Sequence, residues 1–335
     1  MSYTWRVLVA LALAGAVFLL WEIRQVLLLL FGGFVFGAVF TAAGRLVSRL
    51  TGMRRRWGVI VGFLLILLLL SGVAWLIGDA VAAQLDDLRD RVPAAMRSVV
   101  TWLSMYPAGI QLVELWRDLM SDGLPLARLV SAAGLTIGAL GTMILMVMVA
   151  VFLAVEPGLY RQGTLRLLPL AQRERVGAAL DCCALSLRLW LRGQALSMMF
   201  VGLATGIGLT LLDVPLALTL ALLAFLLDFV PYFGPIVAGL LSVLVAFTVS
   251  PQVALYVALL ALAIQQVEGN LLLPLAQRWS VSLPPVLGLV AVVAFGSLFG
   301  LMGVLFATPL MVTLMVLVRE LHVKRMEAGA SAPNV

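Results

Sequence analysis

Charged residues are scarce in this chain: Asp, Glu, Lys and Arg together make up 11% of its 335 residues. A soluble globular protein carries about 25% charged residues, so this chain lacks the polar surface that a water-soluble core would need. Hydrophobic residues make up 63% of the sequence, and the mean hydropathy is +1.14. These values exclude an ordinary soluble enzyme and predict an all-α, polytopic integral membrane protein.

Cysteine and histidine are nearly absent. The two cysteines, Cys182 and Cys183, are adjacent and give no disulfide framework, and the single histidine, His322, lies in a basic tail. The sequence contains no Cys/His cluster, HExxH motif or phosphate-binding GxxxxGK[ST] loop, so we expect no metal, no cofactor, no ATP-driven step and no enzyme activity. The net charge of +6 is interpreted as a membrane-orientation signal rather than as a sign of nucleic-acid binding.

About eight hydrophobic blocks approach the roughly 20 residues that a helix needs to cross a bilayer. They are residues 7–21, 26–43, 57–78, 134–155, 193–212, 215–249, 253–273 and 285–318. We interpret the first as a retained signal-anchor helix, because no clear cleavage site follows it. The blocks 215–249 and 285–318 are too long for one crossing and are interrupted near their middles, so each is expected to be a hairpin or a re-entrant segment.

The distribution of basic residues predicts the orientation of the chain. Residues 44–56 contain several arginines and no acid, which places this loop and both termini in the cytoplasm. The predicted organisation is N-terminal membrane helices over 1–78, an extracytoplasmic amphipathic segment of short helices over 79–133, a membrane helix over 134–155, a cytoplasmic amphipathic segment over 156–192, a C-terminal transport core over 193–318 and a cytoplasmic tail over 319–335.

Two ionisable residues, Asp228 and Glu268, are predicted to lie at membrane depth. Placing a charged side chain at that depth costs at least ~2.5–3.5 kcal/mol, so each of the two residues is expected to have a structural or functional role. One interpretation is a polar path for a substrate or ion, with Gln265 on the same helix face as Glu268. The alternatives are a carboxylate of Glu268 that bridges to Arg278 at the cytoplasmic interface, and an Asp228 that reaches the interface from a helix end.

The run Pro231-Tyr232-Phe233-Gly234-Pro235 interrupts one long block, and Gly300 lies in the interruption of the other. Prolines remove backbone donors and break helices. Backbone groups freed inside a bilayer are tolerated where protein or water satisfies them, so a cavity is expected here, unless the run is a tight turn between two spans. Paired interrupted segments of opposite sense indicate the binding site of a transporter. We expect the two broken centres to approach each other, with block 253–273 packed between them.

Three motifs carry a resemblance that covers nearly the whole chain. They are Asp228-Phe-Val-Pro-Tyr-Phe-Gly-Pro-Ile236, Gln265-Gln-Val-Glu-Gly-Asn270 and Gly300-Leu-Met-Gly303. With them the chain resembles the autoinducer-2 exporter family of bacterial inner-membrane transporters. The resemblance implies a homo-oligomeric secondary transporter of the inner membrane that exports autoinducer-2, a small polar furanone-type signal of quorum sensing. Other members of this family look like sodium/proton antiporters.

The residues and the resemblance together predict where a substrate would bind. Gln265, Glu268 and Asn270 would contact the solute, and Tyr232 with the Pro231–Pro235 backbone would close the pocket. Export would be coupled to a proton at Glu268 or would be facilitated diffusion. The alternatives are a sodium/proton antiporter, which requires Asp228 and Glu268 to come together, and a membrane scaffold without transport. The expected partners are a small-molecule substrate, a proton or sodium ion, the lipid bilayer and further copies of the chain, and no nucleic acid.

Overall fold

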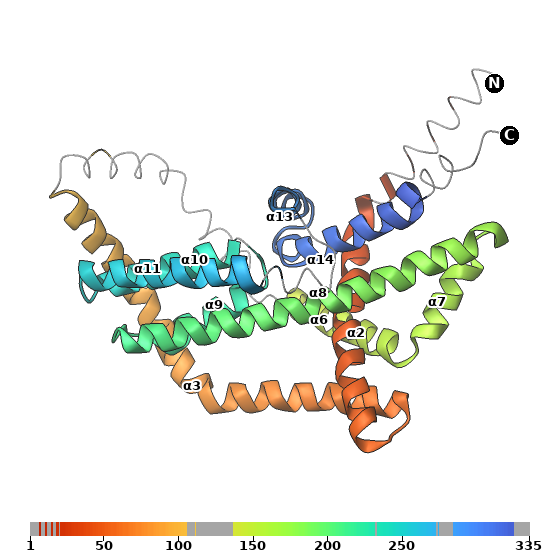
Figure 1. Ribbon diagram of the computed structural model, residues 1–335, viewed down its shortest axis with the longest axis horizontal. Coiled ribbons are helices and arrows are strands. Elements are labelled where there is room, and N and C mark those ends of the chain that lie inside the picture. The colour runs from red at the N-terminus through yellow and green to blue at the C-terminus, as the bar shows by residue number, and fades with distance from the viewer. Residues whose placement is uncertain are drawn as a thin grey trace.

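The computed structural model describes residues 7, 11, 15, 18–19, 21–105, 111, 137–231, 233–272, 274 and 284–324. Every secondary-structure element among them is a helix (Figure 1), which confirms the all-α prediction. Five of these helices are long and apolar enough to cross a membrane, or six if one bent pair counts as a single span. The polytopic prediction is therefore confirmed. The predicted signal-anchor helix over 7–21 lies mostly outside the described residues.

Close packing of glycines holds the N-terminal helices together. Helix α2 (Arg24–Thr51) ends at Gly52, whose φ of 70° lets its N–H bond to the Ser48 carbonyl at 3.0 Å. Helix α6 (Ile137–Val155) packs along α2, where a Cβ on Gly33 would overlap Val149. Small residues of this kind let membrane helices approach closely. Such close packing drives helix association in lipid, where no hydrophobic effect acts between the helices.

Helix α3 (Arg55–Leu103) contradicts one prediction. Its first part is the expected span, but the helix continues without a break through Pro93, so the prediction of short helices is wrong over 79–103. A proline inside a helix costs about 3 kcal/mol, and buried Leu88 and Ala95 on either side show what offsets that cost. In Figure 1 the second part of α3 turns away from the first and slants past α9 and α10, with which it is in contact.

The next two helices cover residues 156–192, for which a cytoplasmic location stays a prediction, and one more span. Helix α6 ends at Val155, and α7 (Pro157–Arg166) leaves it at an angle of 89°, because Pro157 can start a helix but cannot continue one. Helix α8 (Leu170–Leu211) contains the predicted amphipathic helix and the predicted span 193–212 in one continuous element of 42 residues. The predicted boundary at residue 193 therefore falls inside a helix.

Both long blocks are broken where the sequence predicts. Block 215–249 forms α9 (Ala217–Leu227) and α10 (Phe233–Phe247), and block 285–318 forms α13 (Pro285–Phe299) and α14 (Leu301–Val318). At 1.5 Å per residue, α9 is about 17 Å long, and α10 and α13 are each about 22 Å, short of the ~30 Å hydrocarbon core. The halves of each block pack against each other, so both blocks are hairpins.

The two hairpins are built alike at their tips. A Cβ on Gly234 would overlap the carbonyl of Leu227, and a Cβ on Gly303 would overlap the carbonyl of Phe295. In each hairpin a glycine of the second helix thus rests on the backbone of the first. Gly300, with φ 64° and ψ −145°, forms the sharp turn of the second hairpin, a backbone conformation that L side chains rarely adopt.

Helix α8 lies between the two hairpins, where block 253–273 had been predicted. That block forms α11 (Pro251–Val267) and a π-helical turn, η1 (Glu268–Leu272), and packs on α10 and α8. Figure 1 shows α9, α10 and α11 grouped at one end of α8, and α2, α13 and α14 farther along it. Trp190 of α8 contacts the ring of Phe229 at 5.9 Å and shares an apolar cluster with Phe299 and Phe306. The predicted arrangement, with α11 between the broken centres, is therefore wrong.

Candidate functional site

A stripe of small and polar side chains runs along one buried face of α8. Gln194, Ser197, Val201 and Thr205 follow one another at helical spacing, and each is at most 9% exposed. On the adjacent face of α8, Gly202 and Gly206 meet Phe225 and Ala221 of α9 so closely that a Cβ would be 2.8 and 3.0 Å away. The buried polar stripe of α8 therefore runs beside a tight contact between helices.

The carboxylate of Glu268 lies at the end of this stripe. Its Oε1 accepts a hydrogen bond from the Ser197 hydroxyl at 2.8 Å, and its Oε2 accepts one from the Gln265 amide at 3.1 Å. Helix α11 changes to the π-helical turn η1 at Glu268 itself, and such turns frequently occur at functional sites. Glu268 is half-buried and Gln265 is exposed, so the carboxylate can be reached from the side of Gln265.

Asp228 is the deepest charged group in the described part of the chain. It caps the C-terminal end of α9 and is 0% exposed. The Gln194 amide donates to its backbone carbonyl at 2.6 Å and, more weakly, to its Oδ2 at 3.5 Å, whereas Oδ1 is buried without a hydrogen-bond partner. Asp228 is close enough to Glu268 for the two carboxyl groups to interact electrostatically, and the Ser197 side chain interacts with both.

A pocket opens next to this polar cluster. Its volume is about 40 Å³, enough for a few water molecules, since one water needs about 10–15 Å³. Helices α8, α9, α10 and α11 all contribute to its wall. The lining residues are Val201, Thr205, Leu209, Ala224, Pro235, Ala238, Gly239, Ser242, Val257, Leu260, Ala261, Ile264, Gln265 and Glu268. The wall of the pocket is thus mostly apolar, apart from Thr205 and Ser242, and Gln265 and Glu268 form its polar end.

The structure brings together some of the predicted site residues and separates others. Gln265, Glu268 and Pro235 line the pocket, and Asp228 lies beside Glu268. Phe233 and Gly234 form the start of α10: the Phe233 N–H bonds to the Pro231 carbonyl at 2.8 Å, and the Gly234 N–H bonds to the Val230 carbonyl at 2.9 Å. These bonds, together with the prolines, hold the break in one conformation. Tyr232 lies outside the described residues.

Two further predicted residues lie away from the pocket. Asn270 is exposed and donates a hydrogen bond to Gln266 at 2.9 Å, and neither residue lines the pocket. Gly300 turns the other hairpin, between α13 and α14. Arg278, the expected partner of Glu268 in the interfacial alternative, lies outside the described residues.

Sequence reasoning missed the contribution of α8. Gln194, Ser197 and Thr205 were not among the predicted site residues, although Gln194 and Ser197 bond to Asp228 and Glu268. The available signal was their spacing: polar residues three and eleven positions apart lie on one helix face within an otherwise apolar span. Their partners are 34 and 71 residues away in sequence, so the pairing itself could not be found locally.

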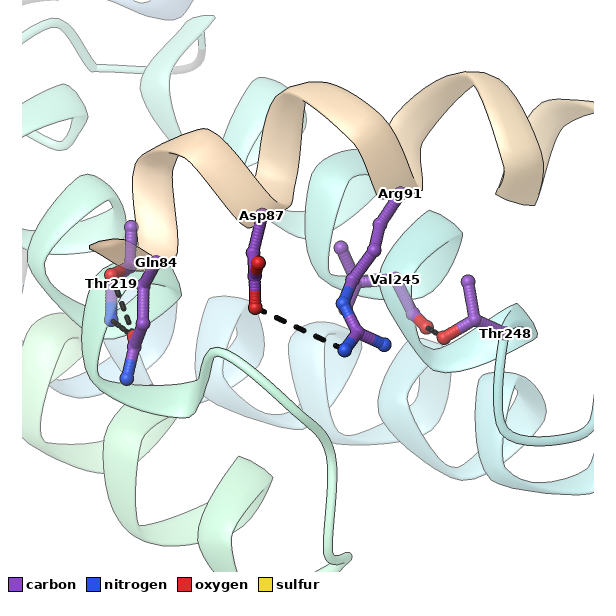
Figure 2. Close-up of polar contacts among 6 residues, drawn as sticks. All are labelled: Gln84, Asp87, Arg91, Thr219, Val245 and Thr248. Carbon is purple, nitrogen blue, oxygen red and sulfur yellow. Dashed lines mark hydrogen bonds and ion pairs between the residues drawn. The ribbon is translucent and has the colours of Figure 1, made fainter. Parts of the chain in front are cut away.

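The second part of α3 fixes the position of α9. Figure 2 shows the side chain of Gln84, whose Oε1 accepts hydrogen bonds from the backbone N–H and the hydroxyl of Thr219 at 3.1 and 2.7 Å. Thr219 lies in the first turn of α9, where backbone N–H groups have no partner within the helix. One turn along α3, Asp87 pairs with Arg91 at 4.0 Å. A side chain of α3 therefore caps the helix that leads to Asp228.

Among the described residues there is no group of three or more His, Cys, Asp or Glu side chains that could hold a metal ion. The chemistry that the arrangement offers is hydrogen bonding to a polar solute and the exchange of a proton or a monovalent cation between two carboxyl groups.

The model of a family described as AI-2E family transporter matches residues 7–322, which is nearly the whole chain. No curated protein matches the chain.

Proposed function

The chain belongs to the AI-2E transporter family, and from this premise we propose that it exports a small polar solute of the autoinducer-2 type. It would act as a secondary transporter in the bacterial inner membrane, as a homo-oligomer. The family match supports a membrane transporter, and the identity of the solute is part of the proposal.

The observation that carries the proposal is the polar end of the apolar pocket. Glu268 and Gln265 present a carboxylate and an amide at this end, and Ser197 holds the carboxylate in place at 2.8 Å. A hydroxyl-rich solute needs acceptors and donors of this kind once it has lost its water. Polar groups are costly at membrane depth. Binding a polar solute, which would take the place of water as their hydrogen-bond partner, gives Gln265 and Glu268 a reason to be there.

The pocket must widen for such a solute to pass, because its volume of about 40 Å³ holds only a few waters. Its wall is divided between the α9–α10 hairpin and helices α8 and α11. Movement of one such unit against the others is how transporters with broken helices expose a site alternately to each side. The break between Asp228 and Phe233 lies beside the polar end, so movement of the hairpin would open the site there.

The experiment is efflux of labelled autoinducer-2 from proteoliposomes. Gln265 and Gln266 form a matched pair, since they are neighbours of the same type and only Gln265 lines the pocket. We expect Gln265→Ala and Glu268→Gln to slow efflux at least tenfold and Gln266→Ala to leave it unchanged. Equal rates for Gln265→Ala and Gln266→Ala would contradict the proposed site. No efflux from well-folded wild type would favour a scaffold without transport.

A second candidate function, sodium/proton antiport, has an observation of its own. This function requires Asp228 and Glu268 to act together, and the two carboxyl groups do interact. Oδ1 of Asp228 is buried without a partner. A buried carboxylate is costly unless it is protonated or paired. The Asp228 carboxyl would therefore release its proton when sodium binds at Oδ1, and would take up a proton again when sodium leaves.

A pH-sensitive dye inside proteoliposomes tests this second candidate under a sodium gradient. Antiport predicts sodium-dependent proton movement that Asp228→Asn abolishes, because an amide cannot exchange a proton. Sodium-dependent proton movement without efflux of autoinducer-2 would replace the first proposal by the second. Efflux without any sodium effect would exclude antiport.

A further inference from the structure

Five arginines from three helices converge at one place on the molecule. Arg45 and Arg49 belong to α2, Arg55 to the start of α3, and Arg188 and Arg192 to the middle of α8. The guanidinium of Arg45 interacts electrostatically with the other four, and that of Arg188 interacts with Arg55 and Arg192. We call these five residues the arginine cluster. They are far apart in sequence, so the fold brings like charges together.

Asp181 and Glu156 are already engaged with arginines outside the arginine cluster. Asp181 interacts with Arg188, but its two carboxylate oxygens accept hydrogen bonds from Arg161 at 2.9 and 2.7 Å. Glu156 pairs with Arg56 at 3.2 Å. Among the described residues, no acid forms an ion pair with any member of the cluster. Five like charges repel one another, so their convergence calls for an anion from outside the chain.

The side chain of Arg45 has unused hydrogen-bonding capacity. A guanidinium has five N–H donors, and that of Arg45 makes one long bond, from Nε to the Thr41 carbonyl at 3.4 Å. Its Nη2 is buried without a partner. The usual orientation rule accounts for arginines in a cytoplasmic loop. It does not account for Arg188 and Arg192 of α8 facing the end of α2, with a buried guanidinium nitrogen left unpaired.

Large, exposed apolar side chains lie next to members of the arginine cluster in the sequence. Leu46 and Leu50, next to Arg45 and Arg49 on α2, are 60% and 78% exposed, and Trp57, two residues after Arg55, is 59% exposed. A soluble anion has no use for such neighbours, whereas a phospholipid has both an anionic headgroup and acyl chains. Basic sites between membrane helices on the cytoplasmic side have this composition.

We propose that the arginine cluster binds the phosphate of an anionic phospholipid headgroup, with the acyl chains against Leu46, Leu50 and Trp57. The arginines bind phosphate oxygens through charge-assisted hydrogen bonds. The lipid would then hold α2, α3 and α8 together at this end. The proposal does not depend on which solute the protein carries.

The test measures thermal stabilisation of the purified full-length protein in neutral detergent by three probes: dioctanoyl phosphatidylglycerol, dioctanoyl phosphatidylcholine and inorganic phosphate. The main variant is Arg55→Gln with Arg192→Gln, since both residues are exposed and glutamine is also a good helix former. The matched control is Arg97→Gln with Arg175→Gln, two exposed arginines outside the cluster. Both double variants remove the same charge.

We expect the same concentration of phosphatidylglycerol to stabilise the wild type and the control. The main variant should need a concentration about tenfold higher for the same stabilisation. Phosphatidylcholine should have no effect. Equal response of the main variant and the control would overturn the site. Equal stabilisation by inorganic phosphate at the same concentration would overturn the lipid and leave a soluble phosphate as the ligand.

A triple variant that adds Arg188→Gln provides a second check, because Arg188 is part-buried within the cluster. Its response to phosphatidylglycerol should be weaker again than that of the double variant. A triple variant that responds as the wild type does would contradict the proposal, whatever its own stability.

Discussion

Replacement of Gly234 by alanine should open the break that positions Asp228. A Cβ at this position would overlap the Leu227 carbonyl and lie 2.8 Å from the Asp228 nitrogen. Neither backbone group can easily move, because the Asp228 N–H bonds to the Ala224 carbonyl at 3.0 Å and the Leu227 carbonyl accepts a hydrogen bond from the Val230 N–H at 3.0 Å. The strain must therefore be relieved by separating α9 from α10.

The expected cost follows from these contacts. Overpacking of this kind costs about 1–3 kcal/mol. If Asp228 shifts, its backbone carbonyl also loses the 2.6 Å bond from Gln194, which adds about 0.5–1.5 kcal/mol. Gly234→Ala should therefore unfold at a clearly lower temperature in detergent and lose transport in proteoliposomes.

Gly239→Ala is the matched control for this variant. Gly239 belongs to the same helix and lines the pocket, but a Cβ there would meet only the Ala261 Cβ at 3.6 Å, an ordinary contact. This variant should unfold near the wild-type temperature. If Gly234→Ala unfolds and transports as Gly239→Ala does, the described geometry of the break is incorrect.

Two further substitutions test how the helices are held. Gln84→Ala removes the cap on the first turn of α9 and should cost about 0.5–2 kcal/mol, with faster amide hydrogen exchange in 217–227; unchanged exchange there would contradict the role of α3. Gly58→Ala should destabilise the α2–α3 contact, because its Cβ would overlap Ser48 and lie 2.7 Å from the Gly44 carbonyl. Gly72 is the control on the same helix, since a Cβ there would meet nothing within 4 Å. Gly72→Ala should therefore stabilise α3 by about 0.5–1 kcal/mol. Equal thermal unfolding of these two glycine variants would refute the packing.

The breaks in the helices could be predicted from sequence because their causes are local. Pro231 and Pro235 remove backbone donors, and Gly300 adopts a backbone conformation that other residues avoid. The helix breaks at the tips of the two hairpins therefore lie where the sequence indicates. Pro157 likewise starts α7 directly after the predicted span.

The course of α3 could not be predicted in the same way. Whether a helix continues through Pro93 depends on the burial of Leu88 and Ala95, and Leu88 packs in a cluster with Leu209 and Val245, far away in the sequence. The same reason explains the position of α8. Nothing near Trp190 in the sequence indicates that its ring meets Phe229.

The candidate site was predictable in part. Glu268 and Asp228 stand out because ionisable residues are rare in apolar blocks, and Gln265 follows from its helical spacing. Ser197 and Gln194 are ordinary polar residues in a long helix, and only the folded chain shows that they bond to those two carboxyl groups. Asn270 shares the motif but points away from the pocket toward Gln266.

The most direct test of the account is efflux of labelled autoinducer-2 measured for Ser197→Ala, for Glu268→Gln and for the double variant. If Ser197 acts by holding the Glu268 carboxylate at 2.8 Å, the two effects share one cause and will not add. We predict that each single variant slows efflux and that the double variant is no slower than Glu268→Gln alone. Wild-type efflux from Glu268→Gln would contradict the central claim that this cluster forms the transport site.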